Sequence, residues 1–199
     1  MKKVYITGTS RGIGAELKSL PFEVIATSRT DGYDIDKNYD KVLSSIIQSD
    51  SDVFINNAYA PKYQTKLLID VFNKWKYLNK QIINIGSCAS DMDLDNLDRQ
   101  RQYPTNKIEQ SEFIRKLNVD YCKSGYKLNE KCRVTNIKMG YVLTEFPSIY
   151  DKKLYPTLDV KQVKQIVEWI INQPDDICMR EISLHSTAEP ILNYYPNLM

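Results

Sequence analysis

The chain has 199 residues, of which 42% are hydrophobic, so its length and composition suit one globular domain over residues 1–199. Its 27 basic and 25 acidic residues leave a net charge of +2, which argues against a nucleic-acid partner. No segment approaches the roughly 18 uninterrupted apolar residues of a membrane helix. The opening MKKVYITG contains too short an apolar run for a signal peptide. We therefore expect a cytoplasmic protein that binds neither membrane nor nucleic acid.

The cysteines and the histidine of the sequence argue against a metal site and against a hydrolase. The four cysteines have no CxxC spacing, and they lie at Cys88, Cys122, Cys132 and Cys178. His185 is the only histidine, so we expect reduced thiols and no metal site. The expected position of His185 in a late strand also argues against a Ser-His-Asp hydrolase.

Hydrophobic patterns alternate between strand and helix along the whole chain. Strands are expected over residues 3–7, 23–28, 52–56, 81–85, 133–138 and 181–184, with a short extended piece at 33–35. Helices are expected over residues 13–20, 39–48, 65–77, 105–123 and 160–172. This alternation predicts an α/β fold of the single-domain Rossmann type, a doubly wound and mainly parallel sheet with helices on both faces.

A glycine-rich loop, TGTSRGIG, joins the first expected strand to the first helix. Three of the seven glycines of the chain fall within it. Gly8 permits a tight turn, Gly12 lets the backbone approach a pyrophosphate, and Gly14 lets the helix pack close to the sheet. Free amides at the start of the helix would face the phosphates. The loop therefore predicts a dinucleotide site.

Tyr103 and Lys107 have YxxxK spacing, which places both on one face of a helix. A nearby ammonium favours the ionised form of tyrosine, whose pKa is otherwise about 10, and such a phenol can exchange a proton with an alcohol or carbonyl. Tyr33 and Lys37 have the same spacing but lie where the adenine end of a cofactor is expected. Ser87, at the carboxyl end of a strand, can polarise a substrate carbonyl.

These motifs, with Asn56-Asn57-Ala58 between them, resemble those of the short-chain dehydrogenase/reductase family in their order. The resemblance covers roughly residues 3 to 185. It implies that Tyr103 is the catalytic acid/base, that Lys107 lowers its pKa and binds the nicotinamide ribose, and that Ser87 orients the substrate oxygen. An asparagine amide after the third strand would tie strands together and brace the cofactor pocket.

The resemblance also implies a set of cofactor-binding residues. They are Gly8, Ser10, Arg11, Gly12, Ile13, Gly14, Arg29, Asp34, Ile35, Asn57, Ala58, Tyr103, Lys107 and Thr144. Asp34 would contact the adenine amino group, Ile35 the ring, and Thr144 the region of the carboxamide. Arg29 stands where a carboxylate would bind a ribose 2′-hydroxyl, and with Arg11 it favours a 2′-phosphate. We therefore expect NADP in preference to NAD, with NAD as the alternative.

Several positions depart from the family pattern. Tyr59 replaces the glycine that usually follows Asn-Asn-Ala, and Met139 replaces the proline before Gly140. The fourth catalytic residue, an asparagine in the helix before Ser87, has no clear match. The second helix of the family is also missing, so the sequence resembles a short, divergent member.

The sequence as a whole predicts an NADP-preferring oxidoreductase that transfers hydride to or from a small carbonyl or alcohol substrate. A non-catalytic NAD(P)-binding sensor or scaffold is the alternative. A sugar-nucleotide epimerase or reductase ranks third, since only 55 residues follow Thr144. The aromatic stretch 145–158, with Phe146, Tyr150 and Tyr155, is the candidate substrate lid. In the family that the sequence resembles, the helix corresponding to residues 105–123 usually pairs with its copy. The resemblance therefore implies a homodimer or homotetramer, which the many charges of this helix leave open.

Overall fold

Six parallel strands form the central sheet of the computed structural model, which describes residues 1–91, 102–123, 131–144 and 157–186. The strands are β1 (Lys3–Thr7), β2 (Glu23–Thr27), β3 (Val53–Asn56), β4 (Gln81–Ile85), β5 (Arg133–Met139) and β8 (Glu181–Leu184). Their order across the sheet is β2-β1-β3-β4-β5-β8, and each neighbouring pair is parallel. The expected doubly wound fold class is therefore confirmed.

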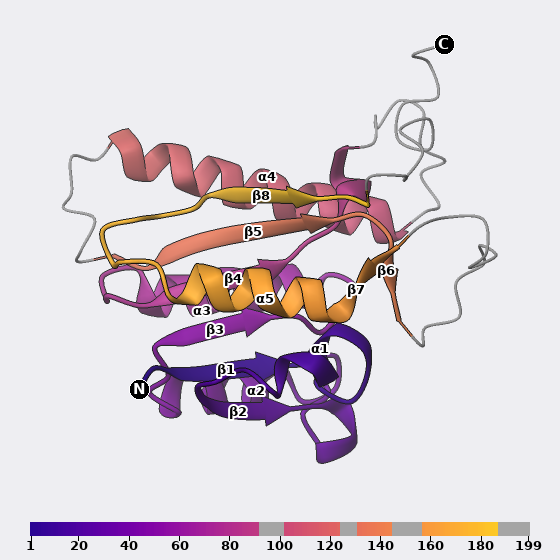
Figure 1. Cartoon of the computed structure of the whole chain (residues 1–199). Helices are drawn as coiled ribbons and strands as arrows, with labels where there is room; N and C mark the ends of the chain where they lie inside the picture. Colours follow the sequence, from indigo (N-terminus) through magenta and orange to yellow (C-terminus); the bar gives the residue numbers. More distant parts are fainter. Residues whose placement is uncertain (92–101, 124–130, 145–156, 187–199) are drawn as a thin grey trace, which may run out of the picture.

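Helices cover both faces of this sheet (Figure 1). They are α1 (Gly12–Leu17), α2 (Tyr39–Gln48), α3 (Tyr63–Trp75), α4 (Gln102–Lys123) and α5 (Val160–Ile171). Two short 3-10 turns, η1 (Arg29–Asp31) and η2 (Cys88–Asp91), follow β2 and β4. In Figure 1, α1 and α5 lie in front of the sheet, and α2, α3 and α4 lie behind it.

Alternate residues of the strands fill two separate cores, as period-2 geometry requires. One core packs Val4, Ile6, Ile55, Ile83 and Ile137 of the sheet against Leu17 of α1 and Val163, Val167 and Ile170 of α5. The other packs Tyr5, Phe54, Ile82 and Val134 against α2, α3 and α4 through residues such as Val42, Ile46, Leu67, Val71, Trp75 and Ile114. Because both faces are buried, the strands consist mainly of apolar residues.

The strand order reverses at β1, which pairs with β2 on one side and with β3 on the other. In open parallel sheets, ligands bind beyond the carboxyl ends of the strands at such a reversal. Gly8 follows β1, Asn57 follows β3 and Gly86 follows β4 at this edge. The topology therefore brings the glycine loop, the Asn-Asn-Ala motif and the Gly-Ser motif together.

Two expectations about the elements need correction. Residues 33–35 form no strand; Ile35 is only 3% exposed and belongs to the core shared with α2 and α3. Helix α4 begins at Gln102, three residues before its expected start, because Pro104 is tolerated in a first helical turn. The first error reflects the tertiary packing of Ile35, and the second reflects a local rule for proline at the start of a helix.

A small second sheet also escaped the sequence patterns. It pairs β6 (Val142–Leu143) with β7 (Leu158–Asp159), and strands of two residues give no readable period. Most of the expected lid, including Phe146, Tyr150 and Tyr155, lies outside the described residues. Within the described part of the chain, no helix is both long and apolar enough to cross a bilayer.

Truncation of Leu67, which is fully buried between α3 and the sheet, tests the core behind the sheet. Leu67→Ala should lower the free energy of unfolding by about 2–5 kcal/mol, because it removes buried methyl groups and leaves a cavity. Leu78→Ala is the matched control, since Leu78 is 44% exposed. Urea denaturation measures both; equal losses in the two variants would contradict this packing.

Candidate active site

The glycine loop after β1 forms a tight cradle. Gly8 and Gly12 have φ values of +73° and +56°, which residues with side chains rarely adopt. A Cβ at Gly14 would collide with the Gly8 carbonyl oxygen and would lie 2.6 Å from Asn57 Nδ2. No side chain caps the start of α1, where Arg11 is the N-cap. The loop thus leaves its backbone open to an anionic group, as a pyrophosphate requires.

Asn57 fixes this cradle to the neighbouring strand. Its Nδ2 donates to the carbonyl oxygens of Thr7 at 3.0 Å and Gly8 at 3.1 Å. The Thr7 hydroxyl oxygen accepts from the backbone N–H groups of Asn57 and Ala58 at 3.3 and 3.2 Å. The Asn-Asn-Ala motif therefore ties the end of β3 to the loop after β1, the bracing role expected for an amide at this position.

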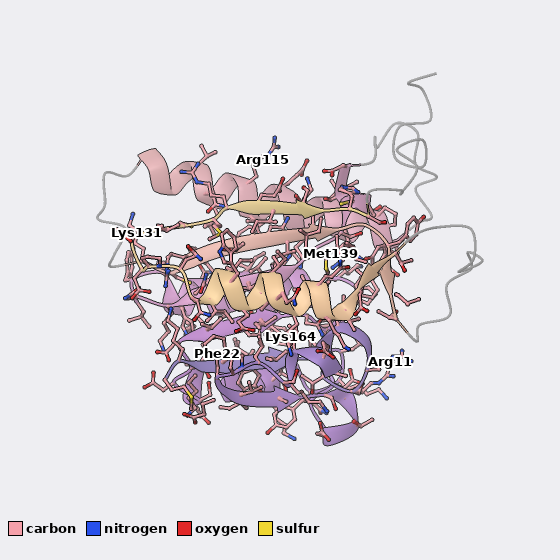
Figure 2. The ribbon with its side chains drawn as sticks, viewed as in Figure 1. Arg11, Phe22, Arg115, Lys131, Met139 and Lys164 are labelled. Atoms are coloured by element: carbon pink, nitrogen blue, oxygen red, sulfur yellow. The ribbon has the colours of Figure 1, made fainter. Side chains whose placement is uncertain are left out.

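Thr144, which follows β6, also contacts the glycine loop. A Cβ at Gly12 would lie 3.3 Å from Thr144 Cγ2. Arg11 is exposed and extends outward beyond the carboxyl ends of the strands (Figure 2). The structure thus brings Gly12 and Thr144 together, although they lie 132 positions apart in the sequence.

The turn after β2 lies next to this loop, since the Thr9 N–H donates to the Thr27 carbonyl at 3.2 Å. Arg29 begins η1 in this turn and is exposed. Sequence reasoning overlooked Asp31 of the same turn, which accepts a 2.6 Å hydrogen bond from the Ser28 hydroxyl. A guanidinium and a carboxylate therefore both stand where the ribose of a dinucleotide would lie.

The two residues expected at the adenine ring have different surroundings. Asp34 Oδ1 accepts a hydrogen bond from the Asp36 N–H at 3.1 Å, which caps the turn that precedes α2. Ile35 is buried in the core beside α2. Their contacts with an adenine remain predictions.

Helix α4 carries Tyr103 in its first turn and Lys107 one turn later. Ser87, which follows β4, hydrogen-bonds with Tyr103. The expected lowering of the Tyr103 pKa by Lys107 needs correction: partial burial raises the pKa of the phenol, although the hydrogen bond from Ser87 acts in the opposite direction. Lys107 Nζ lies 5.7 Å from the Tyr103 ring centroid. The three residues of the expected catalytic triad therefore meet at one place.

The competing YxxxK pair has a different geometry. Tyr33 and Lys37 lie in the irregular segment before α2, so no helix aligns them. The Tyr33 ring faces the ammonium of Lys41 instead, at 4.3 Å from the centroid. The helical arrangement that YxxxK spacing requires exists only for Tyr103 and Lys107 among the described residues.

Lys107 is buried, with 4% of its surface exposed. Its Nζ donates to Gln64 Oε1 at 3.0 Å, to the Ile85 carbonyl at 3.0 Å and to Gln110 Oε1 at 3.5 Å. Desolvation lowers the pKa of Lys107 to about 7. Its charge therefore depends on the neutral acceptors around it, because no carboxylate is among these partners.

Tyr59, which stands in place of the family glycine, connects the cradle with Tyr103. Its ring packs edge-on against that of Tyr103, with centroids 4.9 Å apart. Asn106 Nδ2 donates to its hydroxyl at 3.4 Å. The preceding residue, Ala58, lies against Gly8, where an added Cβ would approach to 2.8 Å. The glycine loop and Tyr103 are thus linked through two adjacent residues.

Sequence reasoning missed several polar residues near this site. Gln64 of α3 holds Lys107, and three buried asparagines, Asn56, Asn84 and Asn136, lie side by side on β3, β4 and β5. His185 Nε2 lies 3.1 Å from Cys88 Sγ, next to Ser87. His185, used above only to argue against a Ser-His-Asp hydrolase, thus contacts the residue that follows Ser87. The described residues contain no cluster of three or more groups that could hold a metal.

The depressed pKa of Lys107 predicts a pH dependence of stability. Between the folded pKa of about 7 and the unfolded value of 10.5, the unfolded chain binds more protons, so the wild type should gain stability as pH rises. The Lys107→Met variant should not show this gain in stability, because it has no ammonium group at position 107. Between pH 7 and 9, urea denaturation should show the wild type gaining about 2 kcal/mol relative to the variant. Parallel pH profiles would show that burial does not perturb Lys107.

Comparison with known proteins identifies the fold. No protein-family model and no curated protein matches the sequence. The structure is similar to 3-alpha-hydroxysteroid dehydrogenase from Pseudomonas sp., solved with NADH, at a TM-score of 0.75 and 15% identity over 99% of this chain and 100% of that one. It is also similar to the alcohol dehydrogenase from Thermococcus sibiricus, solved with 5-hydroxy-NADP (TM-score 0.66, 16% identity, 95% and 98% covered).

A third similar structure is a short-chain dehydrogenase/reductase from Serratia marcescens (TM-score 0.66, 14% identity, 92% and 96% covered). Each match covers nearly the whole of both chains, so the similarity extends to the complete sheet and its helices. With its parallel sheet and glycine loop, this chain has the Rossmann-type fold of the short-chain dehydrogenases/reductases.

Proposed function

We propose that this protein is an oxidoreductase of the short-chain dehydrogenase/reductase type that interconverts a small carbonyl compound and its alcohol, with NADP(H) as the preferred cofactor. The meeting of Ser87, Tyr103 and Lys107 at the edge that also carries the glycine loop is the observation behind this proposal. The solved structures named above include an NADH complex and a 5-hydroxy-NADP complex, which supports a nicotinamide cofactor.

The residues of the cradle fit such a cofactor. Gly14 lets the start of α1 pack directly against the loop, since a Cβ there would collide with the Gly8 carbonyl oxygen, and Asn57 fixes the loop through its two carbonyl contacts. Gly8, Gly12 and Gly14 would hold the pyrophosphate, and Thr144 would lie near the nicotinamide end. When bound, the nicotinamide would donate or accept the hydride.

In the reductive direction, Tyr103 would donate its phenolic proton to the substrate oxygen as the carbonyl carbon gains hydride. The Ser87 hydroxyl would donate a hydrogen bond to the same oxygen and draw charge toward it. Because burial raises the pKa of Tyr103, the phenol stays protonated at neutral pH. This protonation state favours carbonyl reduction over alcohol oxidation near neutrality.

The preference for NADP(H) rests on Arg29 and Arg11, which are exposed beside the cradle. Either guanidinium can form charge-assisted hydrogen bonds with a 2′-phosphate. Asp31 opposes this preference, because its carboxylate would repel a phosphate and accept from a ribose hydroxyl. We propose that the two arginines outweigh this single carboxylate.

Tyr103→Phe tests the catalytic assignment. With NADPH and a panel of aldehydes and ketones, the variant should lose about 100-fold or more of the wild-type turnover, because the proton donor is gone. NADPH binding, followed by fluorescence, should persist. Tyr33→Phe is the matched control, since Tyr33 shares the YxxxK spacing without the helix. Equal turnover of wild type and Tyr103→Phe would favour a non-catalytic NADP(H)-binding module instead.

Arg29→Ala tests the cofactor preference. The variant should bind NADPH about tenfold more weakly while its affinity for NADH stays nearly unchanged, because only the 2′-phosphate loses a partner. Asp31→Asn should shift the affinity ratio in the other direction. Isothermal titration with both cofactors measures these values. An equal loss for NADPH and NADH in Arg29→Ala would refute the preference, and absence of binding to the wild type would refute the whole proposal.

A further inference from the structure

Gln64 is the side chain that most directly controls the surroundings of Lys107. It lies near the start of α3, is buried, and accepts a 3.0 Å hydrogen bond from Lys107 Nζ. Lysine has only donors, so the Gln64 amide must present its oxygen to Lys107 and its nitrogen to the opposite side. Gln64 Nε2 there donates to the Asn56 carbonyl at 3.2 Å.

The bond from Gln64 Nε2 to the Asn56 carbonyl fixes the orientation of the amide, and a second bond ties the two residues together. Asn56 Nδ2 donates to the Gln64 backbone carbonyl at 3.1 Å, so the two residues bind each other twice. The other hydrogen of the same Asn56 amide is directed to Asn84 Oδ1 at 3.0 Å. Gln64 therefore cannot turn its oxygen away from Lys107 without breaking contacts on β3.

Three asparagines continue the network across the sheet. Asn56 pairs in register with Asn84, and Asn84 pairs with Asn136. Asn84 Nδ2 donates to Asn136 Oδ1 at 2.8 Å, and Asn136 Nδ2 donates to the Ser111 hydroxyl at 3.5 Å. The two bonds between the asparagine side chains donate in the same direction, from β3 through β4 to β5.

Both ends of this network lie on α4. Lys107 begins the chain of hydrogen bonds and Ser111, four residues later, ends it on the same helical face. Gly86 leaves room for the Asn136 amide of this network, because a Cβ at Gly86 would lie 2.6 Å from Asn136 Oδ1. An apolar core would stabilise the sheet without such a network, whereas a buried ammonium needs fixed acceptors.

We propose that Gln64 is a positioning residue, held in one orientation by the asparagine network, which fixes the Lys107 ammonium and maintains its charge beside Tyr103. This role rests on the proposed function in one respect only, that Lys107 serves the reaction. The local claim concerns the protonation of Lys107 and is testable without substrate or cofactor.

The test is a pH titration of the Lys107 side chain by nuclear magnetic resonance, with its signal assigned through Lys107→Arg. Gln64→Met keeps the length of the side chain but removes the acceptor, and should lower the pKa of Lys107 by about one unit, a tenfold change in protonation. Gln64→Glu places a carboxylate at the same position and should raise it by about one unit or more. Gln110→Leu should have a smaller effect, since Gln110 Oε1 is 3.5 Å from Nζ.

Gln81→Leu is the matched control, because Gln81 is also buried but lies at the start of β4, away from Lys107. The pKa of Lys107 in Gln81→Leu should equal the pKa of Lys107 in the wild type. If Gln64→Met and Gln64→Glu both match this control, the inference is overturned. Should Gln64→Met fail to fold, the rise in Gln64→Glu decides alone.

A turnover measurement separates this inference from the proposed function. In Gln64→Met the loss of kcat at high pH should begin at lower pH than in the wild type, with KM for the carbonyl substrate nearly unchanged. If the wild type shows no turnover while the Lys107 titrations shift as expected, the proposed function fails and the hold of Gln64 on Lys107 stands. If turnover depends on Tyr103 but the titrations do not shift, only the role of Gln64 fails.

Discussion

The parallel register of β1, β3, β4 and β5 is the constraint on which the site depends. Because these strands run in one direction, their carboxyl ends meet at one edge, where the glycine loop, Asn57 and Ser87 come together. The same register aligns Asn56, Asn84 and Asn136 in neighbouring strands. A shift of one residue in any of these pairs would turn an asparagine toward α1 and α5 and break the network.

Burial of Lys107 is the second constraint, because the fold must supply hydrogen-bond acceptors to its ammonium group. An isolated ammonium in a protein interior is strongly disfavoured, and here neutral oxygens of Gln64 and Ile85 compensate for lost water. The pKa of about 7 shows that the compensation is incomplete. The proposed role of Lys107 therefore opposes stability, since an apolar residue would suit this interior better.

Tyr59 and Asp31 mark where this chain differs from the pattern it resembles. The Tyr59 ring packs edge-on against Tyr103, and its electrostatic effect adds to the burial that raises the pKa of that phenol. Asp31 competes with Arg29 in the turn that would hold the ribose. The acid strength of Tyr103 and the cofactor preference that we propose thus depend on side chains outside the motifs that the chain shares with the family.

The sequence alone determined the alternation of strands and helices, the cradle glycines and the YxxxK pair, because each leaves a local pattern. It also showed that Ser87 follows a strand and that Tyr103 lies 16 residues later at the start of a helix. Only the tertiary structure decided that Ile35 is core, that His185 lies beside Cys88, and that Gln64 holds Lys107. The contacts of His185 and Gln64 join residues that lie 97 and 43 positions apart, and the burial of Ile35 depends on packing. A local sequence pattern carries no information on either.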